Sequence, residues 1–176
     1  MKPIIKIIQD KVPFCKYRVD VPLKSIPHNI ENYGIDMNPD YQRNYIWTQE
    51  QKEKFVGSLI ENPDLIPHFY FNIKDYIMDS CEVVDGKQRL SAIVDWLKGD
   101  IIALCPCGIS LYRKDLDKVS ETLIRVSITT SWKFVKLNKI EVMEFYLRLN
   151  SGGTIHSEED LQRVKDLIIE QKESRI

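Results

Sequence analysis

The residues best suited to chemistry lie together in one short segment, Asp85 to Arg89. The β-branched pair Val83 and Val84 precedes it, as in a buried strand, and apolar residues follow at the spacing of one helix face: Leu90, Ile93, Val94 and Leu97. Where a strand passes into a helix, the first helical amide groups lack partners and the helix dipole places positive charge beside them. This turn is therefore predicted to bind an anion such as phosphate.

Each side chain of the turn has a chemical role available. Asp85 could hold a metal ion such as Mg²⁺, accept a proton or fix Arg89 in place. Gly86 lacks the side chain that would keep a phosphate away, and Lys87 and Arg89 add positive charge. The plainer alternative is structural: Asp85 caps the helix, Gly86 makes the turn, and the two cations are solvated.

Size and composition set the broad class. The 176 residues suit one compact domain, and 43% hydrophobic with 29% charged residues is ordinary for a globular protein that is neither disordered nor membrane-embedded. A formal net charge of −1 gives no global attraction to nucleic acid, so phosphate binding must come from a local cluster. We expect no signal peptide, no membrane partner and a cytoplasmic location.

The four cysteines do not form the paired C-x-x-C motifs of a structural zinc site. Their scatter favours reduced thiols. Only Cys105 and Cys107 lie close in sequence, and no histidine stands at a telling distance from them. We interpret them as small apolar residues of a turn rather than as metal ligands.

Local patterns predict an α+β protein. Strands are expected over residues 13–22, 68–73, 82–84 and 123–135. Thr48 with Gln51 forms a capping box that begins a helix. Further helices are expected from the Asp85–Arg89 turn to Gly99, over 115–123, after Asn138 and after Ser157. The last helix carries an apolar stripe that packs on its own core or docks a partner: Leu161, Val164, Leu167 and Ile168.

Three segments in order, Tyr41–Trp47, Val83–Leu90 and Leu149–Thr154, resemble the N-terminal domain family of GmrSD-type restriction endonucleases. That family belongs to the ParB/sulfiredoxin-like superfamily, which implies a single α+β domain with a small mixed sheet packed with helices. The resemblance covers residues 35–161. It divides the chain into an N-terminal extension with a first strand (1–34), a nucleotide-binding core (35–161) and a C-terminal helix (162–176).

The resemblance also implies site residues and their roles. Asp85 and Arg89 would be catalytic, and Asp85 would hold Mg²⁺ beside a bound nucleoside triphosphate. The implied nucleotide-binding or phosphate-binding residues are Gln42, Arg43, Gly86, Lys87, Gln88, Asn150, Gly152 and Gly153. The family's usual motif is Asp-Gly-Gln-Gln-Arg, so Lys87 departs from it and adds a cation that would favour a polyphosphate.

Alternatives remain for the outer parts of this site. Arg43 could simply pair with an acid such as Asp40. The segment Asn150–Gly153 could form an anion-binding nest of backbone amides or only a glycine-rich helix stop. Trp47, next to the apolar Ile46, is expected to anchor the core rather than to stack on a base.

Three functions fit these observations. The first is a stand-alone NTP-binding and NTP-hydrolysing module linked to DNA restriction, modification or phage–host defence, with a separate nuclease or defence protein as partner. The second is a ParB-like, metal-dependent DNA nuclease acting at the same site. The third is a non-catalytic interaction or anti-defence protein. Because the three histidines form no metal cluster, we do not expect the HNH-type nuclease domain of longer relatives. The oligomeric state stays open.

Overall fold

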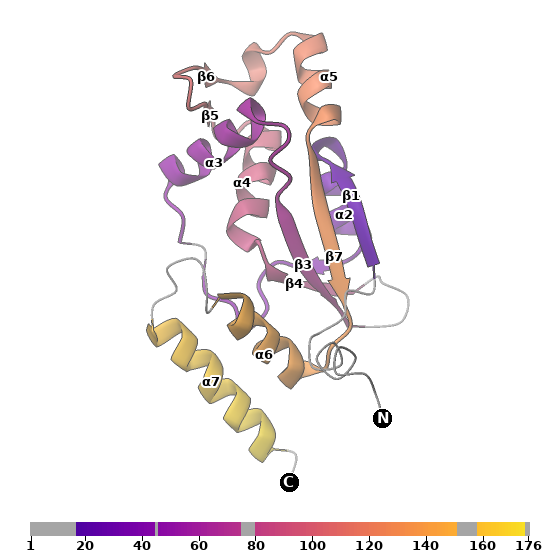
Figure 1. Cartoon of the computed structure of the whole chain (residues 1–176), viewed down its shortest axis with the longest axis vertical. Helices are drawn as coiled ribbons and strands as arrows, with labels where there is room; N and C mark the ends of the chain where they lie inside the picture. The colour runs from indigo at the N-terminus through magenta and orange to yellow at the C-terminus, as the bar shows by residue number, and fades with distance from the viewer. Residues whose placement is uncertain (1–16, 45, 75–79, 151–157, 175–176) are drawn as a thin grey trace, which may run out of the picture.

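A five-stranded mixed sheet lies at the centre of the fold (Figure 1). The computed structural model describes residues 17–44, 46–74, 80–150 and 158–174 of the chain. The strands are β1 (Tyr17–Pro22), β2 (Ile35–Asp36), β3 (His68–Ile73), β4 (Cys81–Asp85) and β7 (Thr129–Val135), in the order β1-β7-β3-β4-β2. The pairs β1–β7 and β3–β4 are antiparallel, whereas β7–β3 and β4–β2 are parallel. The predicted α+β class is confirmed.

Helices pack on the two faces of this sheet. They are α2 (Ile26–Asn32), α3 (Gln49–Glu61), α4 (Lys87–Lys98), α5 (Lys118–Ser127), α6 (Lys139–Asn150) and α7 (Glu158–Glu173). Short 3₁₀ turns span Leu23–Ser25 and Arg113–Asp115, and a small hairpin joins β5 (Ala103–Leu104) to β6 (Ser110–Leu111). Among the described helices, none is both long and apolar enough to cross a bilayer.

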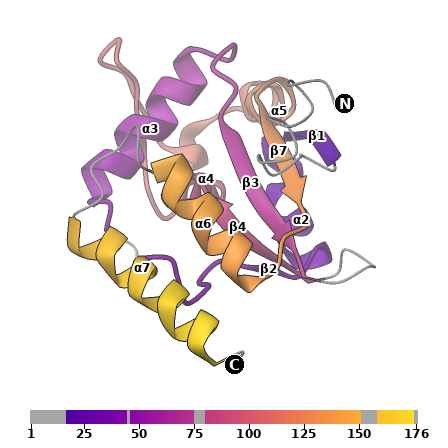
Figure 2. The same cartoon turned by 60° about the horizontal axis from the view of Figure 1, so that its bottom comes forward.

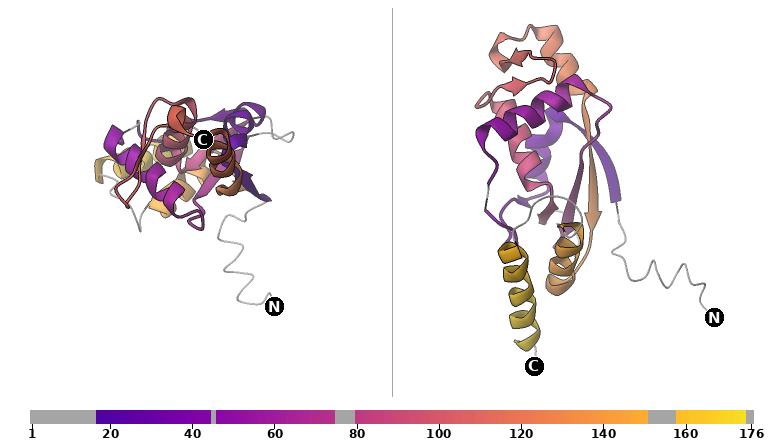
Figure 3. Two further views of the ribbon diagram at one scale, coloured as in Figure 1. Left: turned by 90° about the horizontal axis from the view of Figure 1, so that it is seen from above. Right: turned by 60° about the vertical axis from the view of Figure 1, so that its left-hand side comes forward.

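Two apolar cores follow from the alternation of side chains along the strands. On β4, Val83 lies in the larger core with α3 and α4, whereas Val84 lies in the smaller core with α6 and α7. Figure 2 shows α6 lying across β3 and β4, and Figure 3 shows α7 beside α6 at one end of the molecule. The loop before α3 joins the smaller core through Tyr41, which is fully buried.

Several local predictions are confirmed. Thr48 and Gln51 make both hydrogen bonds of the capping box at the start of α3. The strand over 68–73 has the predicted bounds. Asn138 accepts hydrogen bonds from the first amide groups of α6. Residues 13–16 of the predicted first strand and the predicted cap Ser157 lie outside the described residues.

One prediction needs correction, and one pair of alternatives is resolved in part. The strand expected from Leu123 begins only at Thr129, because Asp117 caps α5 through the amide groups of Val119 and Ser120 and the helix runs on to Ser127. β-branched residues there suggested a strand, but helix capping and packing decided otherwise. Of the two alternatives for the apolar stripe of α7, the structure shows packing on its own core, because Val164 and Ile168 are buried in the smaller core.

Candidate phosphate-binding site

The turn between β4 and α4 leaves the start of the helix without a side-chain cap. Gly86 is the N-cap residue, with φ of 100° in the left-handed region, and it has no side chain that could cap α4. Asp85 therefore does not cap this helix. The arrangement presents the first turn of α4 and the positive end of its helix dipole, which anions prefer.

Gly86 is required here by packing. A Cβ atom at this position would lie 2.3 Å from Cδ1 of Phe69, a fully buried ring of β3. Packing against Phe69 is thus one reason for glycine at this position, and the room that it leaves for a phosphate stays a prediction. The missing side chain admits the Phe69 ring, which in turn underlies the site.

Asp85 and Arg89 form an ion pair on the open side of the turn. Arg89 Nη2 donates to Asp85 Oδ2 at 2.9 Å, and the guanidinium lies 5.4 Å from the centre of the Phe69 ring. Both side chains keep nearly a third of their surface exposed, 29% for Arg89 and 30% for Asp85. Of the three roles foreseen for Asp85, the structure shows the one that fixes Arg89.

Lys87 is buried, contrary to the alternative in which it is solvated. It keeps only 6% of its surface, and its Nζ donates to the carbonyl oxygen of Arg43 at 2.9 Å. Burial lowers the pKa of Lys87 because the ammonium loses its hydration, and the charge of Asp36 offsets only part of that effect. An ammonium has three hydrogens, and this carbonyl takes one of them.

Gln42 and Gln88 tie the preceding loop to the turn. Gln42 Nε2 donates to the carbonyl oxygens of Val83 and Val84 at 2.7 and 2.9 Å. Gln88 Oε1 accepts from the backbone amides of Ile46 and Trp47, each at 3.1 Å. These contacts position the loop. Direct contact of either glutamine with a phosphate stays a prediction.

Arg43 lies beside the turn on that loop. Its Nη1 is 3.8 Å from Oδ2 of Asp160 in α7, and only 12% of the side chain is exposed. The acid first considered as its partner, Asp40, instead pairs with Lys139 of α6. The guanidinium of Arg43 is thus held between the loop and α7, close to the start of α4.

These residues line two adjoining hollows. The first has a volume of about 290 Å³ and is lined by Gln42, Arg43, Trp47, Val84, Asp85, Gly86, Lys87, Gln88, Arg89, Tyr146, Leu149 and Asn150. The second, of about 550 Å³, shares Gln42, Arg43 and Lys87 with the first and extends to Asp160 and Arg163. The first hollow brings together every predicted site residue that the structure describes; Gly152 and Gly153 lie outside the described residues.

Comparison with known proteins places the chain in a family. The family model described as "GmrSD restriction endonuclease, N-terminal domain" matches residues 23–136, well over half of the sequence. The chain belongs to this family. The resemblance inferred from its motifs is thereby confirmed, and the matched residues include the turn and the loop that line the first hollow.

Other comparisons add less. No curated protein sequence matches the chain. Among solved structures, a similar one is the C-terminally truncated chromosome-partitioning protein ParB from Caulobacter crescentus complexed with CTP-γ-S, at 14% identity and a TM-score of 0.44. The match covers 89% of this chain and 65% of the ParB chain.

Part of the hollow in this family member comes from beyond residue 136. Asn150 ends α6 and lines the first hollow, and its Nδ2 donates to the carbonyl of Tyr146 at 2.7 Å. Tyr146 lines the same hollow. The pKa of its hydroxyl is raised, mainly because the side chain is buried. The loop and the strand-to-helix turn therefore form only part of the lining, and α6 supplies the rest through Tyr146, Leu149 and Asn150, of which the last two belong to the third motif segment.

Sequence reasoning missed two contributors from α7. Arg163 donates to the backbone carbonyls of Asp40 and Tyr41 at 2.9 and 3.0 Å, and Asp160 contacts Arg43. Both lie on the polar face of an amphipathic helix more than a hundred residues further along the chain, where side chains are normally solvated. Nothing in the local sequence separates them from ordinary surface charges.

Proposed function

We propose that this chain binds the phosphate chain of a nucleoside triphosphate in the first hollow and hydrolyses it with Mg²⁺. One observation carries the proposal. Arg43, Lys87 and Arg89 converge from the loop and α4 on one hollow, which lies at the uncapped start of α4. Guanidinium groups and helix amides together are well suited to bind phosphate oxygens.

Charge balance favours a polyanion at this site. Among the described residues, the charged ones that line the first hollow are three cations, Arg43, Lys87 and Arg89, and one acid, Asp85. A phosphate beside Lys87 would also offset the cost of burying its ammonium, because an anion stabilises the charged form. A volume of about 290 Å³ suits a phosphate chain, with the nucleoside extending toward the second hollow.

The donor set also fits Mg²⁺, which is commonly held by one or two carboxylates together with substrate phosphate oxygens. Asp85 would hold the ion, since it supplies the carboxylate of the first hollow while one of its oxygens accepts from Arg89. Bound Mg²⁺ would polarise the phosphate oxygens. Arg89 and Lys87 would stabilise the negative charge that develops during transfer, and Arg43 would orient the phosphate chain.

Membership of the restriction-endonuclease family supports a role linked to DNA restriction or defence. In this proposal the nucleotide state of the hollow controls a separate nuclease or defence protein in the cytoplasm. We also propose that the chain binds DNA in this role. The family supplies this context, and the geometry of the hollow supplies the chemistry.

The test measures nucleotide binding and hydrolysis separately. The full chain is titrated with ATP, GTP, CTP and UTP, with and without Mg²⁺, and both melting and phosphate release are followed. Arg89→Ala is expected to weaken binding by about 10- to 100-fold, since a hydrogen bond to a charged group contributes about 1.5–3 kcal/mol. Arg18→Ala, at an exposed position on β1, is the matched control and should bind as wild type does.

Two outcomes would contradict the proposal. If none of the four nucleotides binds, the hollow is not a nucleotide site. If DNA is cut in a reaction that needs Mg²⁺, Asp85 and Arg89 but no nucleotide, the nuclease hypothesis replaces it. The residues of the hollow argue against the nuclease hypothesis. Two-metal nucleases need several carboxylates, and the described lining of the first hollow supplies Asp85 alone.

A further inference from the structure

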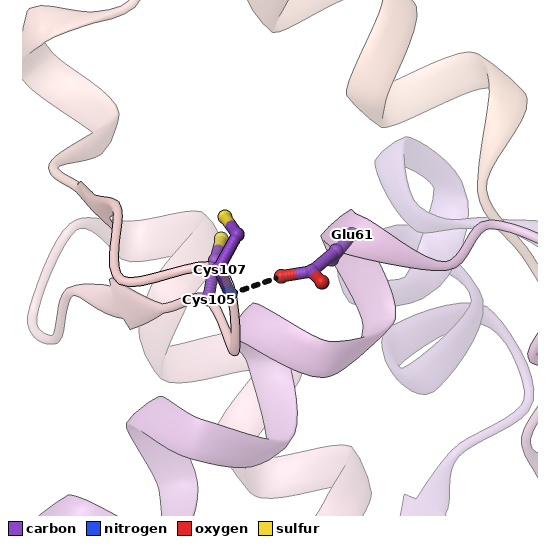
Figure 4. Close-up of side chains that lie close together, drawn as sticks. All are labelled: Glu61, Cys105 and Cys107. Carbon is purple, nitrogen blue, oxygen red and sulfur yellow. Dashed lines mark hydrogen bonds between the residues drawn. The ribbon is translucent and has the colours of Figure 1, made fainter.

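A second cluster of reactive side chains lies where the β5–β6 hairpin meets the end of α3. The loop Cys105–Gly108 closes by a hydrogen bond from the Gly108 amide to the Cys105 carbonyl at 2.9 Å, and the Cys105 amide bonds to the Ile109 carbonyl. Gly108 has φ of 88°, as a tight turn requires. Figure 4 shows that this turn places both cysteine sulfurs on the same side of the loop.

Glu61, the last residue of α3, completes the cluster. Its Oε2 accepts a hydrogen bond from the Cys107 amide at 2.8 Å (Figure 4). One ligand atom each from Glu61, Cys105 and Cys107 can be chosen so that all lie within 4.8 Å of one another. Cys105 is buried, whereas Cys107 and Glu61 are exposed, so an ion can enter from solvent.

The backbone holds the two halves of the cluster in register. A Cβ atom at Gly57 of α3 would lie 1.9 Å from the carbonyl oxygen of Leu104, so helix and hairpin are in direct backbone contact. Gly57 lies one helical turn before Glu61, and Leu104 directly precedes Cys105. The backbone positions of the three residues are therefore set by packing before any ligand binds.

The chemistry of this cluster suits a borderline-soft cation. Two thiolates and a carboxylate are ligands of Zn²⁺, and tetrahedral bonds of about 2.3 Å to sulfur and 2.0–2.2 Å to oxygen place the ligand atoms about 3.5–3.8 Å apart. Small side-chain rotations close the present spacing to that value. The negative end of the α3 dipole also favours a cation at Glu61.

We propose that Glu61, Cys105 and Cys107 form a zinc site, with water as the fourth ligand. Binding forms two Zn–S bonds and one Zn–O bond and releases the thiol protons to solvent. This proposal revises the sequence interpretation of the two cysteines as plain turn residues, which lacked Glu61. None of the three residues lines either hollow. The bound ion would therefore link the β5–β6 hairpin to α3 independently of nucleotide binding.

The test uses the full chain kept reduced with a phosphine and stripped of metal by a chelator. One equivalent of Co²⁺ should give thiolate-to-cobalt charge-transfer absorption, and Zn²⁺ should abolish it by displacement. Cys107→Ser is expected to lower Zn²⁺ affinity by about 100-fold, and Glu61→Gln by about 10-fold, because both remove a ligand. Glu50→Gln, at an exposed position near the start of the same helix, should bind as wild type does.

Two results would overturn the site. One is the absence of thiolate-to-cobalt absorption at one equivalent. The other is unchanged Zn²⁺ affinity in both Cys107→Ser and Glu61→Gln, which would mean that the metal binds elsewhere on the chain. Because Cys107 and Glu61 are exposed, neither substitution should prevent folding, and circular dichroism of each variant checks this. Nucleotide binding is measured on the same samples, so that either proposal can fail alone.

Discussion

Replacing Gly86 by alanine tests whether the turn was shaped by packing. The added methyl group would lie 2.3 Å from Cδ1 and 2.9 Å from Cε1 of Phe69, and φ of 100° is unfavourable for any L-residue. The conformational cost is about 1–2 kcal/mol and the overpacking cost about 1–3 kcal/mol, so the free energy of unfolding should fall by about 2–5 kcal/mol. Urea denaturation measures this loss.

Gly99 provides the matched control at the other end of the same helix. Its φ is 87°, and a Cβ atom there would have no neighbour within 4 Å, so Gly99→Ala should cost only the conformational part, about 1–2 kcal/mol. In the double variant Gly86→Ala with Phe69→Leu, the loss should be smaller than the sum of the single losses, because the smaller side chain removes the clash. Equal losses in Gly86→Ala and Gly99→Ala would refute the packing argument.

Further predictions concern the helices around the site. Thr48→Ala should lower the free energy of unfolding by about 1 kcal/mol, since it removes the α3 cap, and an unchanged urea midpoint would contradict this. Val164→Ala should cost about 2 kcal/mol because the side chain is fully buried, whereas the exposed Ile169→Ala should cost almost nothing; equal values would mean that α7 does not pack as described. The pKa of Lys87 is lowered by burial, so the unfolded chain holds that proton to higher pH. The free energy of unfolding of wild type, measured relative to that of Lys87→Met, should therefore rise as the pH is raised toward 10.5. The rise should be about 1.4 kcal/mol for each unit by which burial lowers the pKa of Lys87. Urea titrations in which this difference falls with pH would reject the prediction.

The sequence predicted those parts of the fold that depend on local signals. The capping box at Thr48 and the alternation over 68–73 act within a few residues, and both are present in the structure. The strand prediction for residues 123–127 was wrong, because the β-branched residues there lie in helix α5, which is capped by Asp117. Propensity is a weak signal where capping and packing oppose it.

The candidate site shows the same division. The position of Asp85 to Arg89 at a strand-to-helix turn was predictable, since hydrophobic periodicity changes there. The burial of Lys87 was not predictable, because it depends on a carbonyl 44 residues earlier in the chain. The contacts of Asp160 and Arg163 with the loop arise only when α7 packs on α6.

Some side chains of the turn make contacts that hold the loop in place, and others line the hollow. Lys87 does both. Its ammonium donates to the Arg43 carbonyl, and the residue lines both hollows. In the family's usual motif a neutral glutamine stands at this position, and an amide could bond the same carbonyl without the cost of burying a charge. A lysine is therefore the costlier choice for holding the loop. Its charge becomes an advantage when an anion lies in the hollow, which is the physical reason to expect a polyphosphate there.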